Sequence, residues 1–318
     1  MIGAPATSRQ ETPVFFDADE GTLFGFFGRP TTDPVGAAIV TLPGGSTPLS
    51  TNRNRFSVRV CRQMAGLGYH SLRFDYHGAG ESTGMIERLD LAQPFIHDLH
   101  AAVGWLEDRG IREFVFVGSC FGGRTALSSA PGISGVKGVV MVSPPVRDEA
   151  MGERSTVTAA LEWSVGQYVR RALRPRTLAG LLDANHRAVY ARYIRTKLRA
   201  LSARRTNGSS SSAAEAPSPV LPAGPNLLEP LAALVERRVP VLFIYGSTEV
   251  HYKEFLTARE GELGEILERA GDLVEVVTVP GRVHGFPSLR VQESAAELVS
   301  DWVSRLDRAP VGAVRAST

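Results

Sequence analysis

The chain has 318 residues, of which 43% are hydrophobic, 8% aromatic and 21% charged, with 32 glycines and 20 prolines. This is the composition of an ordinary globular protein, and it excludes a collagen-like, fibrous or wholly disordered chain. The 35 basic and 33 acidic residues leave a formal charge of +2, which argues against nucleic acid as the main partner.

The sequence also lacks targeting and membrane signals. No apolar run approaches the roughly 20 residues that a membrane-spanning helix needs. Residues 1–10 have neither the charged start nor the apolar stretch of a signal peptide. Two cysteines, Cys61 and Cys120, are too few for a disulfide framework or for a zinc site of their own. We therefore expect a cytoplasmic protein without membrane contact, metal or cofactor.

Strand and helix patterns alternate along the first part of the chain. Apolar runs at 14–17 and 23–27 predict an N-terminal hairpin. The continuous apolar run at 37–42 predicts a strand that is buried on both faces. The elements expected after it are a helix at 55–67, a strand at 70–76, a helix at 95–106, a strand at 114–117, a helix from Arg124 and a strand at 136–142.

The pattern changes at residue 147. Residues 151–201 have helical spacing and a strongly basic composition, whereas residues 202–225 are rich in Ser, Ala and Pro and predict a flexible loop. We interpret residues 147–226 as a helical lid inserted between two parts of a core, residues 1–146 and residues 227–318.

Strand and helix patterns resume after the lid, with strands at 239–245 and 273–279, a helix after Glu249 and a last helix at 287–306. Alternation of buried strands with helices indicates a mostly parallel sheet with helices on both faces. The predicted fold class is therefore α/β.

The most informative motif is Gly118-Ser119-Cys120-Phe121-Gly122-Gly123, between a predicted strand and a predicted helix. Its spacing is that of the nucleophile elbow G-x-S-x-G, with cysteine in place of serine. The glycines let strand and helix approach closely, and the turn presents the side chain at a helix N-terminus, where the dipole favours a thiolate. We interpret Cys120 as a nucleophile. The alternative is a small buried hydrophobic residue, which is our interpretation of Cys61.

A nucleophile elbow predicts an acid and then a histidine further along the chain. Glu249 follows the strand at 239–245, and His284 lies in the loop after the strand at 273–279. Ligands of open α/β sheets bind beyond the carboxyl ends of the strands, so the three groups can meet there. His284 would take the thiol proton and Glu249 would hold its imidazole. Asp148 is the alternative acid. His251, two residues past Glu249, either lines the site or, as we expect, faces solvent in a loop.

With these motifs the chain resembles the α/β-hydrolase family, and its elbow is similar to the G-x-C-x-G-G of dienelactone hydrolases, which also use cysteine. Residues 75–82 (DYHGAGES) look like the family's D-x-x-G-x-G-x-S turn, and Pro43-Gly44-Gly45-Ser46 sits where the family has its oxyanion loop. The resemblance implies an α/β-hydrolase fold. It also implies an oxyanion hole formed by the backbone N–H groups of Phe121 and Gly45, or of Gly44 or Ser46 in place of Gly45.

The lid contributes candidate binding residues. Its many arginines form either a solvated helical face or a landing surface for an acidic carrier protein or a coenzyme A thioester. Trp163 and Tyr168 either line an acyl pocket, together with Gly44 and Ser46, or form the lid's own core.

These features predict a Cys120–His284–Glu249 triad that hydrolyses an ester or thioester by acyl transfer. The acyl-enzyme of a cysteine is itself a thioester, so exchange with a thioester substrate is nearly balanced in free energy. One alternative is an acyltransferase, cyclase or carboxylate-eliminating lyase in polyketide-type biosynthesis, a branch of specialised metabolism. Another is a non-catalytic binding module on the same fold.

Overall fold

The computed structural model describes residues 11–19, 21–44, 49–51, 54–86, 95–148 and 222–308. The chain divides into two compact units, and all described residues belong to the unit formed by Met1–Glu149 and Val220–Thr318. Most of the predicted lid therefore lies outside the described residues, including Trp163, Tyr168 and the basic segment. Gly45 and Ser46 lie outside them as well.

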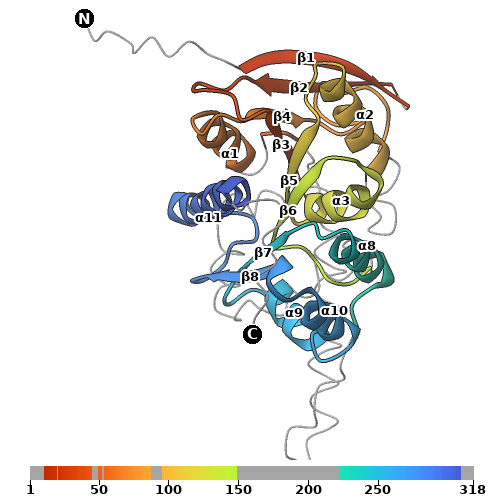
Figure 1. The fold of residues 1–318 in the computed structure, drawn as a ribbon, viewed down its shortest axis with the longest axis vertical. Coiled ribbons are helices and arrows are strands. Elements are labelled where there is room, and N and C mark those ends of the chain that lie inside the picture. The colour runs from red at the N-terminus through yellow and green to blue at the C-terminus, as the bar shows by residue number, and fades with distance from the viewer. Residues whose placement is uncertain are drawn as a thin grey trace, which may run out of the picture. The chain divides into compact units, whose positions relative to one another are not determined.

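An eight-stranded, mostly parallel sheet forms the centre of this unit (Figure 1). In chain order its strands are Glu11–Ala18 (β1), Gly21–Gly28 (β2), Ala37–Leu42 (β3), His70–Phe74 (β4), Glu113–Ser119 (β5), Val136–Val142 (β6), Val241–Gly246 (β7) and Val274–Val279 (β8). They lie side by side in the order β1-β2-β4-β3-β5-β6-β7-β8. The pairs β1–β2 and β2–β4 are antiparallel, which confirms the N-terminal hairpin, and all other neighbours are parallel.

Helices cover both faces of the sheet, as predicted (Figure 1). In chain order they are Phe56–Ala65 (α1), Ile96–Glu107 (α2), Phe121–Ser129 (α3), Pro225–Glu236 (α8), Val250–Ala258 (α9), Glu262–Ala270 (α10) and Leu289–Arg308 (α11). Helices α1 and α11 pack together on one face, and α2, α3 and α8 pack along the other. Because both faces are covered, every residue of β3 and of β7 is buried.

The spacing of apolar residues in the two helices on one face explains how they attach. Phe56, Val60 and Met64 recur every four residues in α1, which places them on one side of the helix. They join Val299 and Trp302 of α11 in a buried cluster over the strands. Each such large side chain stabilises the fold by about 1.5–3 kcal/mol through burial.

Two predicted elements differ from the observed ones near the elbow and the glycine-rich turn. Helix α3 begins at Phe121 and not at Arg124, because the chain turns into the helix directly at Cys120, its N-cap residue. Strand β4 ends at Phe74 and not at residue 76. The Asp75 N–H still donates a 2.8 Å hydrogen bond to the Phe24 carbonyl of β2, but the Asp75 carbonyl accepts a 2.7 Å hydrogen bond from the Ser82 hydroxyl in the glycine-rich turn.

Two helices were not predicted. Pro225 opens α8 at the end of the Ser/Ala/Pro-rich segment, since proline at a first helical position loses no hydrogen bond. The leucines of α8 are buried against the core. Helix α10 follows α9 with Leu263 and Ile266 as its buried positions. The Ser/Ala/Pro-rich residues before Pro225 obscured the start of α8, and α10 has only nine residues, so the pattern of each becomes decisive only when the core offers a surface to cover.

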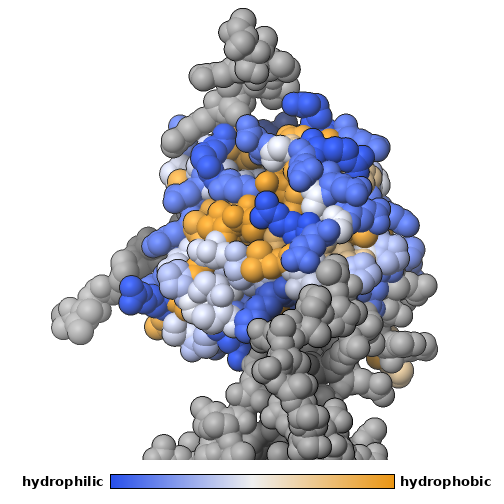
Figure 2. Space-filling view, turned by 90° about the horizontal axis from the view of Figure 1, so that it is seen from below, coloured by the Kyte–Doolittle hydropathy of each residue, from blue (hydrophilic) through white to orange (hydrophobic). Residues whose placement is uncertain are grey.

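One face of the described unit combines polar and hydrophobic patches. Figure 2 views the end of the unit where β8, α9 and α10 lie, and shows hydrophobic residues grouped within a hydrophilic surround. Exposed large hydrophobic side chains of the described residues include Leu256 in α9 and Val276 in β8. None of the described helices has both the length and the apolar character required to cross a membrane.

Candidate active site

Cys120 occupies the sharp turn between β5 and α3. Its backbone has φ 50° and ψ −116°, a conformation that is costly for a residue with a side chain. The turn is held by a 2.7 Å hydrogen bond from the Cys120 N–H to the Val142 carbonyl on β6. The side chain is 7% exposed and lies at the N-terminus of α3, where the helix dipole favours negative charge.

The glycines around this turn have no room for a side chain. A Cβ on Gly118 would overlap the backbone of Gly122, and a Cβ on Gly122 would overlap carbonyl oxygens at the end of β3. A Cβ on Gly44 would overlap the carbonyl of the residue before Cys120 and lie 3.0 Å from the Cys120 Cβ. The glycine spacing read from the sequence therefore corresponds to close backbone approach between β5, α3 and the loop after β3.

Two imidazoles lie beside the Cys120 thiol. His284 comes from the loop after β8, and His251 comes from the first turn of α9. The Cys120 Sγ and one ring nitrogen of each histidine all lie within 4.8 Å of one another. The two rings meet edge to face, with centroids 5.1 Å apart. Among the described residues, no other three His, Cys, Asp or Glu side chains bring their ligand atoms close enough to contact one metal ion.

The position of His251 shows that the prediction of a solvent-facing histidine was wrong. Its side chain is 17% exposed, and its Nδ1 lies 3.4 Å from Oε2 of Glu254, three residues further along α9. The sequence feature that could have indicated this position is the start of a helix directly after Glu249. In a helix, residues 251 and 254 share one face, and that face turns toward the site.

Glu249 holds the loop that carries His284. The residue is 4% exposed, and its Oε2 accepts hydrogen bonds from the backbone N–H groups of His284 at 2.8 Å and Val283 at 3.2 Å. Its Oε1 is buried without a hydrogen-bond partner in the part of the chain that the structure describes. The carboxylate thus fixes the backbone of the histidine loop.

Asp148, the alternative acid, has other partners. It forms an ion pair with the fully buried Arg124 of α3. It also accepts hydrogen bonds from the backbone and side-chain nitrogens of Asn226, both at 3.0 Å. Through these contacts Asp148 links α3 to the start of α8. The geometry therefore favours Glu249 as the carboxylate of this site.

The histidines reverse the effect of burial on the thiol. Burial acts to raise the pKa of Cys120, but hydrogen bonds and electrostatic attraction from His251 and His284 outweigh it and lower the pKa to about 6. For His251, burial acts to lower the pKa, but hydrogen bonds and attraction from the Cys120 thiolate and Glu254 raise it to about 9. Both pKa shifts favour a Cys120 thiolate beside a protonated His251 imidazole.

Two of the predicted oxyanion-hole residues are described and adjoin the thiol. Phe121 is the first residue of α3, so its backbone N–H is among those that find no partner within the helix. Gly44 packs against the elbow, as its contact with Cys120 shows. The arrangement brings a nucleophile, two imidazoles and the backbone of Phe121 and Gly44 together at one edge of the sheet.

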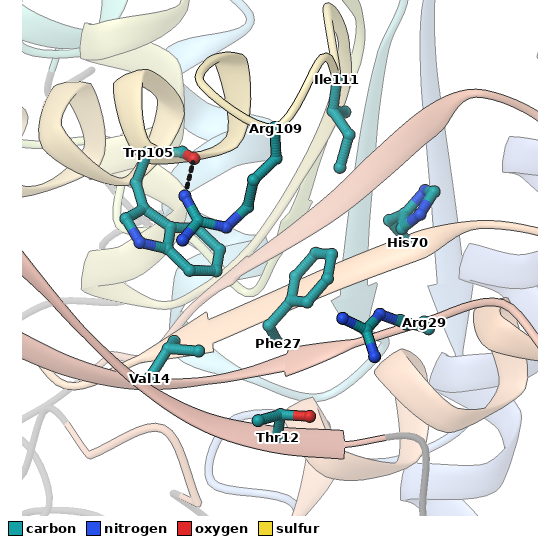
Figure 3. Close-up of a pocket in the computed structure, with 8 residues that line it drawn as sticks. All are labelled: Thr12, Val14, Phe27, Arg29, His70, Trp105, Arg109 and Ile111. Atoms are coloured by element: carbon teal, nitrogen blue, oxygen red, sulfur yellow. Dashed lines mark hydrogen bonds between the residues drawn. The ribbon is translucent and has the colours of Figure 1, made fainter.

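A separate pocket of about 350 Å³ lies near the opposite end of the strands (Figure 3). The Phe27 ring contacts the rings of Trp105 and His70, and the Arg109 guanidinium lies 3.4 Å from the Trp105 ring centroid. Its other lining residues are Thr12, Val14, Arg29 and Ile111. His70 begins β4 whereas Cys120 follows the end of β5, and both strands run parallel to β3, so this pocket is not part of the cysteine site.

Comparisons with known proteins agree with the observed fold. The family model described as serine aminopeptidase, S33 (Hydrolase_4) matches residues 50–253, well over half of the chain. No curated protein sequence matches the chain.

Several solved structures share the fold over nearly the whole chain. The esterase Pf2001 of Pyrococcus furiosus has a TM-score of 0.59 at 17% identity, covering 96% of this chain and 97% of that one. The α/β hydrolase GrgF of a Penicillium species has a TM-score of 0.55 at 18% identity, with 94% and 98% covered. Dienelactone hydrolase of Anabaena variabilis has a TM-score of 0.53 at 16% identity, with 93% and 97% covered.

Proposed function

The chain belongs to the serine aminopeptidase S33 family of α/β hydrolases, and within that family we propose that it is a cysteine-dependent hydrolase of an ester or thioester. The observation that carries the proposal is the strained elbow conformation of Cys120 with two imidazoles within 4.8 Å of its ligand atom. Backbone strain of this kind is retained where function requires it. A buried cysteine that served only packing would need neither the strain nor the imidazoles.

In the first half of the proposed reaction, Sγ of Cys120 attacks the carbonyl carbon of the substrate. The S–C bond forms, and the bond from that carbon to the leaving oxygen or sulfur breaks. A pKa near 6 supports this role, because most of the thiol is already ionised at neutral pH. The backbone N–H groups of Phe121 and of Gly44 or Gly45 would bind the oxyanion, each contributing about 3 kcal/mol to the transition state.

In the second half, His284 takes a proton from water while the water oxygen attacks the thioester carbon. The C–S bond breaks and Cys120 leaves as a thiolate. Glu249 supports this step because its carboxylate fixes the backbone of the loop that presents His284. A misplacement of the base by about 1 Å can cost on the order of 100-fold in rate.

An ester or thioester suits this nucleophile better than a peptide bond. An amide carbonyl is less electrophilic than an ester or thioester carbonyl, and an unprotonated amine is a poorer leaving group than the Cys120 thiolate, so an amide is the most demanding of the three substrates. The fold similarity to an esterase and to a dienelactone hydrolase is in keeping with ester chemistry. From the basic composition of residues 147–226 we further propose that the acyl group arrives on an acidic carrier protein or on coenzyme A.

The test uses a Cys61→Ala background, in which Cys120 is the remaining thiol. Iodoacetamide alkylation is followed by mass spectrometry as a function of pH, with and without His284→Ala. We expect the alkylation rate to rise with a midpoint near pH 6 and to move to higher pH in the His284 variant. An ordinary thiol midpoint near 8.5, or no alkylation of Cys120, would contradict the proposal.

A second measurement tests acyl transfer itself. The same background is mixed with p-nitrophenyl acetate and with an S-acetyl thioester, and the acetyl adduct is located by peptide mass spectrometry. We expect a transient adduct on Cys120 that water discharges. Faster discharge by an added alcohol or amine would show an acyltransferase in place of a hydrolase. Product release without any Cys120 adduct would rule out covalent catalysis by this residue.

A further inference from the structure

We propose that His251 is a second catalytic histidine, which protonates the leaving group when the Cys120 thiolate attacks, and that Glu254 is the residue that positions it. This inference rests on the proposed function and assigns different tasks to the two imidazoles. His284 would activate water in the second half-reaction, and His251 would serve the first.

The argument begins with the orientation of the His251 ring. Its Nδ1 lies 3.4 Å from Oε2 of Glu254, and one of its ring nitrogens lies within 4.8 Å of the Cys120 Sγ, so the ring stands between the carboxylate and the thiol. The His284 and His251 rings meet edge to face, so the two imidazoles are not stacked. The two histidines also come from different elements, α9 and the loop after β8, and so they can flank a substrate carbonyl from two directions.

The charges around His251 decide whether its imidazole ring is protonated. On its own helix it meets the Glu254 carboxylate, from the elbow it meets the Cys120 thiol, and from the loop after β8 it meets the His284 ring. Two of these three groups are anions when ionised, and both favour an imidazolium. The pKa of about 9 for His251 supports this state at neutral pH. A protonated imidazole beside a thiolate can donate a proton but cannot accept one, so it is suited to be the acid.

His284 differs in its contact with a carboxylate. Glu249 binds the backbone N–H of His284, whereas Glu254 lies against the ring of His251. The negative charge next to the ring therefore acts directly on His251. This asymmetry is the basis for giving the acid role to His251 and the base role to His284.

The proton balance closes over one turnover. His251 gives its proton to the departing oxygen or sulfur and becomes neutral as the acyl-enzyme forms. Water then loses a proton to His284, the C–S bond breaks and Cys120 returns as a thiolate. Transfer of that proton from His284 to His251, directly or through solvent, restores the starting state. The net reaction is hydrolysis to an acid and an alcohol or thiol, with no other reactant.

The proposal also narrows the substrate class. A leaving group that is already a stable anion, such as p-nitrophenolate, gains little from a general acid. An aliphatic alkoxide is a poor leaving group and gains on the order of 100-fold or more. We therefore assign the site to esters of aliphatic alcohols and to alkyl thioesters, with the larger dependence on His251 for the oxygen esters.

The experiment compares two esters that share one acyl group, the p-nitrophenyl and the ethyl ester. Their kcat/KM values are measured for the wild-type protein, His251→Gln, Glu254→Gln and the control Lys253→Gln, which changes an exposed residue of the same helix. Loss of thiolate fraction in a variant affects both esters equally, so it cancels in the ratio of the two values. We expect the ratio of ethyl to p-nitrophenyl ester to fall about 100-fold in His251→Gln, about 10-fold in Glu254→Gln and not at all in Lys253→Gln.

Equal losses for both esters in His251→Gln would overturn the acid role and leave His251 as a group that only tunes the thiol. If His251→Gln does not fold, an unchanged ratio in Glu254→Gln would overturn the acid role in the same way. The acyl adduct on Cys120 separates the two proposals. An adduct with an unchanged ester ratio contradicts only the role of His251, whereas absence of the adduct contradicts the cysteine mechanism.

Discussion

The two cysteines of this chain are both buried, yet their surroundings drive their chemistry in opposite directions. Cys61 lies inside α1, 2% exposed, with the Thr41 hydroxyl 3.8 Å from its sulfur. There burial raises the pKa of the thiol from 9.0 to about 11, despite a hydrogen bond that acts to lower it. At Cys120 the same burial is outweighed by two imidazoles, and the pKa is about 6. Burial alone therefore does not decide thiol reactivity; the neighbouring charges do.

Backbone position adds to this difference. Cys61 lies in the middle of a helix, where its backbone groups are paired and the helix dipole has little effect. Cys120 is the N-cap residue of α3, in a strained conformation that directs its side chain to the positive end of the helix dipole. The surroundings of Cys61 thus suit a packed, neutral thiol, whereas those of Cys120 stabilise a thiolate.

The largest effect is expected from substitution of Cys120, the proposed nucleophile. Cys120→Ala should lower kcat/KM for an ester by at least about 1000-fold, since no other group can form the acyl-enzyme. Cys61→Ala should leave kcat/KM within about threefold. Both variants are assayed with the same substrate, and circular dichroism checks that each is folded. Comparable activity of Cys120→Ala and Cys61→Ala would mean that the comparison has no bearing on catalysis.

The next prediction concerns the carboxylate that holds the histidine loop. Glu249→Gln removes the charge that binds the N–H groups of Val283 and His284, so kcat/KM should fall about 100-fold. Asp148→Asn is the matched control, because it breaks the ion pair with the buried Arg124.

For the control we expect a loss of about 3 kcal/mol in the free energy of unfolding, with kcat/KM changed only a few-fold. Urea unfolding measures the first quantity and steady-state kinetics the second. The opposite pattern would make Asp148 the acid of the site.

The third prediction concerns how stability and activity depend on pH through the Cys120 thiol. The pKa of Cys120 in the folded protein lies below its ordinary value, so the folded state favours the thiolate. The stability that this contributes is complete above the ordinary thiol pKa and is lost as pH falls through about 6. Activity should follow, with kcat/KM dropping about tenfold per pH unit below that point. A midpoint unchanged by His284→Ala would remove the histidine from the explanation.

The smallest effect is expected at Cys61, with the opposite sign. Its pKa is raised in the folded state, so above pH 9 the unfolded chain loses the thiol proton first and stability falls as pH rises toward 11. At pH 10 this difference corresponds to about 1 kcal/mol. Urea unfolding at pH 8 and pH 10 should show that loss in the wild-type protein and a smaller one in Cys61→Ala. Equal losses in both would mean that Cys61 is not responsible.

Sequence patterns alone predicted most of the strands, the glycine-flanked turn at Cys120 and two polar residues that follow strand ends. Apolar runs such as 37–42 and 136–142 coincide with the observed strands, because a strand buried on both faces is apolar at nearly every position, with Thr41 and Lys137 as the exceptions here. The glycines beside Cys120 mark a backbone contact that no side chain can enter. Glu249 and His284 follow strand ends, and parallel strands bring such ends to one edge of the sheet.

Which polar side chains meet at that edge follows from the packing of elements that are distant in the chain. The sequence placed His251 near a strand end but could not show that the first turn of α9 directs it to Cys120. Nor could it show that Asp148 is engaged by Arg124, or that Glu249 binds the backbone of the histidine loop. Periodicity and glycine spacing are local properties, so they appear in the sequence. The direction of one side chain at the start of a helix depends on how that helix packs against strands far away in the chain.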